Sequence, residues 1–164
     1  MFFNDDSYVD YSINTTIGRF LNGEFLTSGN YITIEQANMI EDNTTWYLGI
    51  VESRSSYKKA KYTDINMSSL TSKTTNTKIG LLRFGELMAG QFHNTYSEKT
   101  NWIITRYGNN VNAYFIGSRG GLSTYDNQWA TGVGVKPVFY LKENVTITSG
   151  DGTLQNPFQI ELSN

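Results

Sequence analysis

The sequence predicts an α+β domain with two short helices near the N-terminus, followed by mostly antiparallel sheets and a long loop region. Apolar residues recur at helical spacing only near the start of the chain. Shorter runs of aromatic and β-branched residues, bounded by glycine, asparagine and serine, follow them. A length of 164 residues suffices for one sizeable core. We therefore expect one domain over 1–164.

The first helix is expected over 15–26, where a threonine can act as the N-cap. Its core-facing residues recur at helical spacing: Ile17, Phe20, Leu21 and Phe25. A second short helix is expected over 33–40, because Thr33 followed three residues later by Gln36 is a capping-box pattern. We also expect a turn or short helix over 83–90.

Strands are expected at 46–51, 78–83, 101–106, 111–116, 134–142, 145–148 and 158–162. Pro137 must lie at an edge or a bulge, because proline cannot donate a ladder hydrogen bond. Residues 4–14 are typical of an edge strand or an extended entry. The stretch 52–77 lacks periodicity and is expected to be a surface excursion, and 122–130 is expected to be a loop. The turn residues of 149–153 precede the closing strand.

The composition excludes several classes of function. The formal net charge is -2, which argues against nucleic-acid binding through phosphate neutralisation. The chain has no cysteine, so disulfides, thiolate-bound metals and a thiol nucleophile are excluded. A single histidine, His93, excludes a multi-histidine metal site, and we expect it to be an ordinary loop residue.

The compartment is expected to be extracellular. Charged residues are 17% of the chain, below the roughly 25% of an ordinary soluble domain, and aromatic residues are 14%. Polar but uncharged chains rich in tyrosine and threonine are common among bacterial surface proteins. No apolar run is long enough to span a bilayer, and the N-terminus lacks the features of a secretion signal. We therefore expect a trimmed ectodomain that does not insert into a membrane.

The second half of the chain resembles a known family. The motifs are Gly80-Leu81-Leu82, a strand led by Trp102, Tyr114-Phe115-Ile116, the strand 134–142, the turn 149–153 and Asn156-Pro157-Phe158. This order resembles the C-type-lectin-like domain of the formylglycine-generating-enzyme type. It is similar to its relatives in surface, adhesin-like and pilin-associated proteins of Gram-positive bacteria. Lys136 stands where those relatives usually carry arginine, and the resemblance covers about residues 16–162.

The resemblance implies a C-type-lectin-like fold with curved sheets, paired terminal strands and a loop region that forms the recognition face. It does not imply the oxidase activity of the family, which uses cysteines and copper, because this chain has no cysteine. It also gives no sugar specificity, because the calcium-binding triplets of the lectins do not occur around Pro137 or Pro157. The resemblance therefore implies the fold and a role in displaying a contact surface, but it does not imply a specific ligand.

The segment 106–129 carries the candidate contact surface. Aromatic side chains supply contact area at low entropic cost, and amide and guanidinium groups supply hydrogen bonds. The candidate ligand-binding residues are Arg106, Tyr107, Arg119, Tyr125, Asn127 and Trp129. An equally weighted alternative places Tyr125 and Trp129 in the core beneath the loop. Trp46 and Trp102 are expected to be core residues.

Other clusters favour plainer interpretations. Asp5, Asp6 and Asp10 could ligate calcium, but no EF-hand spacing occurs, so we expect solvated acids and no cofactor. The basic residues of 57–62 could contact an acidic polymer, although a solvated loop is the more common explanation. Glu86 and Asp126 could form a carboxylate pair for glycoside hydrolysis.

These observations predict a non-enzymatic extracellular binding or display module. It could be the globular head of a pilin-like or adhesin subunit that recognises a glycan or a protein surface. The alternatives are a purely structural subunit that self-assembles in a fibre, and a carboxylate-based hydrolase. The hydrolase is disfavoured because one histidine and no cysteine leave few groups for a catalytic set.

Overall fold

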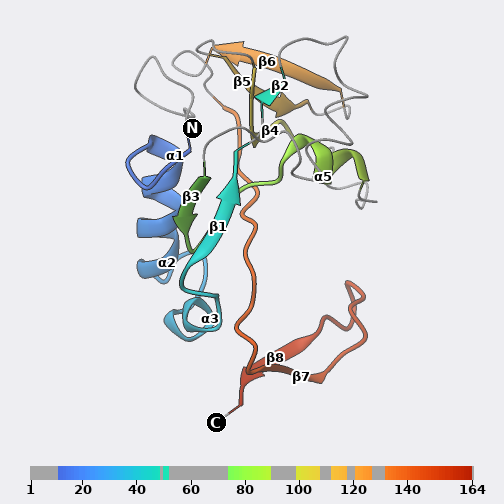
Figure 1. The fold of residues 1–164 in the computed structure, drawn as a ribbon. Helices are drawn as coiled ribbons and strands as arrows, with labels where there is room; N and C mark the ends of the chain where they lie inside the picture. The colour runs from blue at the N-terminus through green and yellow to red at the C-terminus, as the bar shows by residue number, and fades with distance from the viewer. Residues whose placement is uncertain are drawn as a thin grey trace.

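A computed structural model describes residues 11–48, 50–51, 74–89, 99–107, 112–117, 121–126 and 132–163. The chain mixes helices with several small sheets, as predicted for an α+β protein. Figure 1 shows the first helices beside a two-stranded sheet, a larger sheet at one end, and a β-hairpin at the opposite end. A long extended segment connects the larger sheet to this hairpin.

The N-terminal helical segment is continuous and consists of α1 (Thr16–Arg19), the π-helix η1 (Phe20–Glu24) and α2 (Phe25–Thr27). Thr15 is its N-cap, because the Thr15 hydroxyl accepts a hydrogen bond from the Gly18 amide at 3.2 Å. Ile17 and Leu21 are fully buried, and the two phenylalanines are half-buried. The predicted helix and its apolar face are confirmed.

The second helix, α3 (Ile34–Asn38), has the predicted capping box. The Thr33 hydroxyl accepts from the Gln36 amide at 3.1 Å, and the Gln36 side chain accepts from the Thr33 amide at 2.9 Å. Two N-terminal backbone donors are thereby satisfied. A turn or short helix was expected over 83–90, and the structure has a helix there, α5 (Phe84–Ala89).

The two-stranded sheet pairs β1 (Thr44–Tyr47) with β3 (Thr74–Thr77), antiparallel. The indole N–H of Trp46 donates to the Thr77 carbonyl at 3.0 Å. The buried Trp46 ring packs in the core and so joins this sheet to it. The expectation that all of 52–77 is a surface excursion is therefore wrong at its end. Four polar residues form a strand there because β1 supplies their backbone partners, which a periodicity pattern does not reveal. Residues 52–73 lie outside the described part of the chain.

The larger sheet has the order β2 (Ile50–Val51), β4 (Asn101–Tyr107), β5 (Asn112–Ile116) and β6 (Leu122–Asp126). The β2–β4 pair is parallel, and the other pairs are antiparallel. The predicted hairpin of β4 and β5 is confirmed. The expected loop at 122–130 is wrong over its first half, because β6 pairs with β5 along all five of its residues. The predicted strand 46–51 is split between two sheets.

The predicted strand over 78–83 is not a regular strand, although Ile79 and Leu81 are fully buried. Gly80 makes an isolated bridge to Val138. The backbone groups of Ile79 bond to the Asn22 side chain instead of a neighbouring strand. The apolar pattern therefore predicted the burial of this segment correctly. It was wrong about a strand, because the backbone of Ile79 bonds to a side chain.

The predicted strand over 134–142 is also not regular. It runs as an extended segment and makes isolated bridges at Gly134, Val138 and Leu141 to three different parts of the chain. Pro137 lies between two of these bridges, where its missing N–H breaks no ladder. The closing strand pairs with the strand that precedes it in the sequence. The edge strand or extended entry expected over 4–14 is not a strand at 11–14, where the chain turns before the first helix, and residues 4–10 lie outside the described ranges.

The core gathers between the helical segment, the two-stranded sheet and β4. Its fully buried side chains include Ile17, Leu21, Ile79, Leu81 and Trp102. Trp46 and Trp102 are 6% and 1% exposed, which confirms the prediction that both are core residues. The C-terminal hairpin contributes no side chain to this core cluster.

Candidate docking surface

The C-terminal hairpin is built from β7 (Val145–Ser149) and β8 (Gln159–Leu162). Val145 pairs with Leu162, and Ile147 pairs with Ile160. Directly opposed residues of an antiparallel pair point to the same face, and side chains alternate along each strand. These four aliphatic residues therefore share one face of the hairpin.

The residue before β8 extends this apolar face. Phe158 directly precedes β8, and its ring lies beside Gly152, so it continues the apolar row toward the turn. We call this set the docking face: Val145, Ile147, Phe158, Ile160 and Leu162. Ile147 is 62% exposed and Phe158 is 51% exposed, so part of the docking face is open to solvent. An apolar row of this kind on a projecting element is typical of a protein interaction site.

The opposite face of the hairpin is polar. Thr146 pairs with Glu161, and Ser149 pairs with Gln159 across a bulge. The Thr146 and Ser163 hydroxyl oxygens lie 3.1 Å apart, within hydrogen-bonding distance. The hairpin therefore has one apolar face and one polar face, as strands of a half-buried sheet do, although neither face joins the core cluster.

The turn of the hairpin is ordered by glycine and by short side-chain bonds. Gly150 and Gly152 have φ values of +89° and +80°, a region in which residues with a Cβ are strained. The Asp151 carboxylate accepts from the Thr153 amide at 3.0 Å, and this bond together with the Thr153 hydroxyl lowers the pKa of Asp151 below its usual range. The turn expected over 149–153 is confirmed from Gly150 onward, while Ser149 still belongs to β7.

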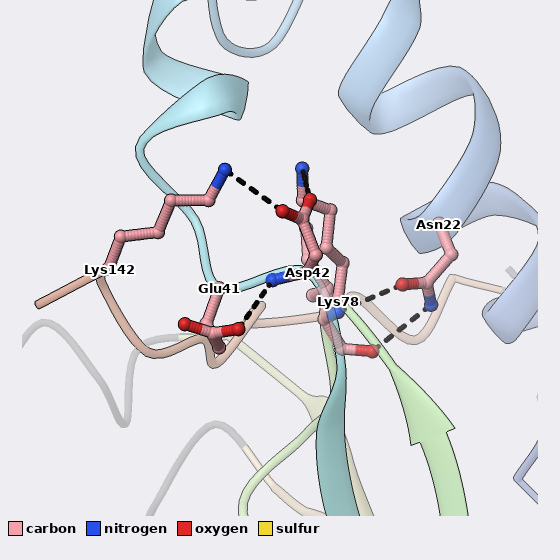
Figure 2. Close-up of polar contacts among 6 residues, drawn as sticks. Asn22, Glu41, Asp42, Lys78 and Lys142 are labelled. Carbon is pink, nitrogen blue, oxygen red and sulfur yellow. Dashed lines mark hydrogen bonds and ion pairs between the residues drawn. The ribbon is translucent and has the colours of Figure 1, made fainter.

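Asp42 fixes the base of the hairpin to the body of the protein. Figure 2 shows that the amines of Lys78 and Lys142 both contact its carboxylate. The distances are 2.8 Å to the Lys78 amine and 2.9 Å to the Lys142 amine. Hydrogen bonds from Lys78 and Lys142 lower the pKa of Asp42 from 3.8 to about 2. The backbone continues this attachment, since the Lys142 amide donates to the Met39 carbonyl at 2.9 Å. Lys142, which precedes the hairpin, is therefore held against the body, while the docking face extends beyond the body.

A second feature is a groove of about 550 Å³ at the start of β4. Its described lining residues are Lys99, Thr100, Asn101, Gly132, Gly134, Val135 and Lys136. The walls are joined by the Gly134 amide, which donates to the Thr100 carbonyl at 2.8 Å. Lys99 and Lys136 are the two charged residues of this lining.

The candidate contact residues predicted from the sequence lie at the larger sheet or beyond the described ranges. Arg106 and Tyr107 end β4, and Tyr125 lies in β6. Ala113 pairs with both Arg106 and Tyr125, so these positions lie in one row across three strands. Arg119, Asn127 and Trp129 fall outside the described residues, as do His93, the acids of 5–10 and the basic residues of 57–62.

Of the carboxylate pair considered for hydrolysis, Asp126 is the last residue of β6 and Glu86 lies in α5. Glu86 lies 2.7 Å from the Arg83 guanidinium and also accepts from the Arg83 amide at 2.9 Å. Its carboxylate is thus held by an arginine within one helical turn. Within the described ranges, no three acidic, histidine or cysteine side chains gather as a metal site. No helix in the described part of the chain is long and apolar enough to cross a bilayer.

The docking face is the feature that the sequence interpretation missed. The alternation of Val145 and Ile147, and of Ile160 and Leu162, was visible and predicted the strands correctly. Apolar residues in alternating strands are usually buried, so the pattern alone gives no sign that this face remains open. Comparison with family models, with curated proteins and with solved structures found no match for this chain.

Proposed function

We propose that this chain is a non-enzymatic binding or display module that acts outside the cell, and that its docking face contacts another protein surface. The observation that carries this proposal is the row of apolar side chains on a hairpin outside the core, with Ile147 62% exposed. Soluble chains rarely expose such a row unless a partner covers it.

The proposal includes a C-type-lectin-like fold. Two of the motifs on which the resemblance rests, the strand led by Trp102 and the segment 134–142, are adjacent in space, because the Trp102 amide donates to the Gly134 carbonyl at 3.0 Å. The preceding helical segment and the small antiparallel sheets agree with such a fold at the level of its α+β class. A display module of this kind needs a rigid body and an accessible contact surface.

The test is a binding assay on the immobilised chain, for which the probes are a second copy of the chain, a panel of purified extracellular proteins, and neutral and acidic glycans. We expect binding to a protein probe that falls by about tenfold or more in Ile147→Lys. Thr146→Lys is the matched control, because it adds the same charge to the polar face of the same strand.

Two outcomes would overturn the proposal. Binding to glycans that is unchanged in Ile147→Lys and lost in Tyr125→Ala or Trp129→Ala would assign recognition to the loops. Hydrolysis of any glycan by the wild-type chain, lost in Glu86→Gln, would assign an enzymatic function.

A further inference from the structure

We infer that Asn22 is a site of spontaneous deamidation, and that the contact of the first helical segment with Ile79 controls when the reaction occurs. Asn22 is the one asparagine of the chain that glycine follows. Glycine carries no side chain that hinders its backbone, so its nitrogen reaches a preceding asparagine side chain more readily than that of any other residue. This modification site goes beyond the proposed function, because the docking face takes no part in it.

The reaction needs only the chain and water. The Gly23 amide nitrogen loses its proton and attacks Cγ of Asn22. A new C–N bond closes a cyclic imide, and the side-chain nitrogen of Asn22 leaves as ammonia. Water then opens the imide at either of its carbonyls and leaves aspartate or isoaspartate at position 22. The electrons and atoms balance without an oxidant, a reductant or a cofactor.

In the folded chain the amide of Asn22 is held away from this reaction. Its oxygen accepts from the Ile79 N–H at 2.8 Å, and its nitrogen donates to the Ile79 carbonyl at 3.0 Å. The same nitrogen lies 3.2 Å from the carbonyl of Gly18, which precedes it in the helix. Figure 2 shows the Asn22 side chain pointing out of its helix, with dashed lines to both amide atoms. The amide is therefore directed toward Ile79 and not toward the Gly23 nitrogen, which lies C-terminal to it.

The backbone adds a second barrier. Asn22 and Gly23 lie inside η1, and Arg19 and Phe25 on either side of it have right-handed helical φ and ψ. Ring closure needs the backbone at Asn22 to leave this conformation, because a helical ψ keeps the following nitrogen away from Cγ. The neighbouring Leu21 is fully buried, so this change also pulls an apolar side chain from the core. The first helical segment must therefore open before Asn22 reacts.

No contact in the described chain requires glycine at position 23. A Cβ added to Gly23 would meet nothing within 4 Å, and Gly23 is not among the glycines with a positive φ. Glycine also disfavours a helix relative to alanine. The consequences of this glycine are thus a helical segment that opens more easily and a reactive asparagine within it.

Deamidation prevents the segment from returning to its place. An aspartate at position 22 still accepts from the Ile79 N–H, but it cannot donate to the carbonyls of Ile79 and Gly18, and its negative charge would lie against both oxygens. Isoaspartate also lengthens the backbone within the helix and so breaks its hydrogen-bond pattern. Each opening of the segment therefore carries a chance of permanent release from the core.

Peptide mapping by mass spectrometry during incubation in mildly alkaline buffer tests the inference, and enzymatic methylation detects the isoaspartate. We expect Asn22 to deamidate at least about tenfold more slowly in the folded chain than in the chain unfolded in guanidinium chloride. Gly23→Ala should keep the fold and suppress the reaction in the unfolded chain. Equal rates in the folded and unfolded wild type, or an unreactive Asn22 in the unfolded wild type, overturn the inference.

Two threonine caps separate local opening from unfolding of the whole chain. Thr15→Ala removes the side-chain cap of the first helical segment, and Thr33→Ala removes the equivalent cap of α3. We expect folded Thr15→Ala to deamidate at Asn22 about fivefold faster than the wild type, and folded Thr33→Ala to match the wild type. Equal acceleration by both variants would contradict control by the first segment. Amides of 16–27 that stay fully protected from hydrogen exchange in the deamidated protein would contradict the release.

Discussion

The side chain of Asn22 bonds to both backbone hydrogen-bonding groups of Ile79, although the two residues are far apart in the sequence. Its amide oxygen accepts from the Ile79 N–H at 2.8 Å, and its amide nitrogen donates to the Ile79 carbonyl at 3.0 Å. The Tyr11 hydroxyl donates to the same carbonyl. One amide on the π-helix thus takes the place of a neighbouring strand, and it joins the first helical segment to the core (Figure 2).

We predict that Asn22→Ala lowers the free energy of unfolding by about 2–4 kcal/mol, because two backbone groups of Ile79 lose their partner in or near the core. Asn22→Asp is expected to be destabilising as well, since a carboxylate accepts from the Ile79 N–H but cannot donate to its carbonyl. Urea denaturation measures both. Asn144→Ala is the control, because the Asn144 amide makes one exposed bond to Ser163. Equal losses in Asn22→Ala and Asn144→Ala would contradict the prediction.

The relation between Asn22 and Ile79 also shows where sequence reasoning succeeded and where it stopped. Local signals were sufficient for the helices: the Thr33–Gln36 capping box depends on residues three apart. Strands β7 and β8 and the turn between them followed from alternation and from turn glycines, which are equally local, whereas the pairing of these two strands with each other was not predicted. The structure of the segment 78–83 did not follow from local signals. Its Ile79 backbone bonds to the side chain of Asn22, which is distant in the sequence and is not indicated by any periodicity.

Strands β3 and β6 were missed for a related reason. Their residues are mostly polar, and each is a strand because a neighbouring strand pairs with it. Their threonines and tyrosine favour strands, but neither segment has the apolar alternation from which the other strands were predicted. For the candidate site, the sequence analysis chose aromatic and arginine residues of 106–129, whereas the described hairpin exposes Ile147 and Phe158, which that analysis did not select. Exposure depends on what packs above a strand, and the strand's own pattern does not specify it.

Gly80 lies against the ring of Trp46, and we predict that Gly80→Ala is destabilising. An added Cβ would lie 2.6 Å from Trp46 Cε3 and 2.7 Å from Cε2, so the buried indole must move. The expected loss is about 1–3 kcal/mol, with a change in tryptophan fluorescence. Gly23→Ala is the control: nothing lies within 4 Å of its added Cβ, and the helical position should gain about 0.5–1 kcal/mol. If Gly80→Ala is neutral, Trp46 is not tightly packed there.

Asp42 predicts a pH dependence of stability. Its folded-state pKa of about 2 is below the ordinary value of 3.8, so the carboxylate contributes stability that is complete above about pH 4 and is lost as the pH falls toward 2. We expect Asp42→Asn to be less stable than the wild type at neutral pH and equal to it near pH 2. Thermal unfolding across this range measures the difference. Because the ion pairs are exposed, high salt should reduce it, and a salt-independent difference would contradict the ionic explanation.

Gly150 tests whether the hairpin unfolds separately from the body. An alanine there would hold φ near +89°, with its Cβ against the Pro157 carbonyl and 2.9 Å from Phe158 Cα, so the turn cannot form without rearrangement. We expect Gly150→Ala to abolish the protection of hairpin amides from hydrogen exchange. Its effect on the unfolding of the body should be below about 0.5 kcal/mol, because the core cluster contains no hairpin residue.

The control for this variant is Gly29→Ala. Gly29 lies between α2 and α3, its φ is +73°, and the space around an added Cβ is open. It should cost the body about 1 kcal/mol through backbone strain alone and leave the hairpin amides protected. If Gly150→Ala destabilises the body as much as Gly29→Ala does, the hairpin folds cooperatively with the core. In that case its exposed apolar row is held in place by the body and needs no partner to form.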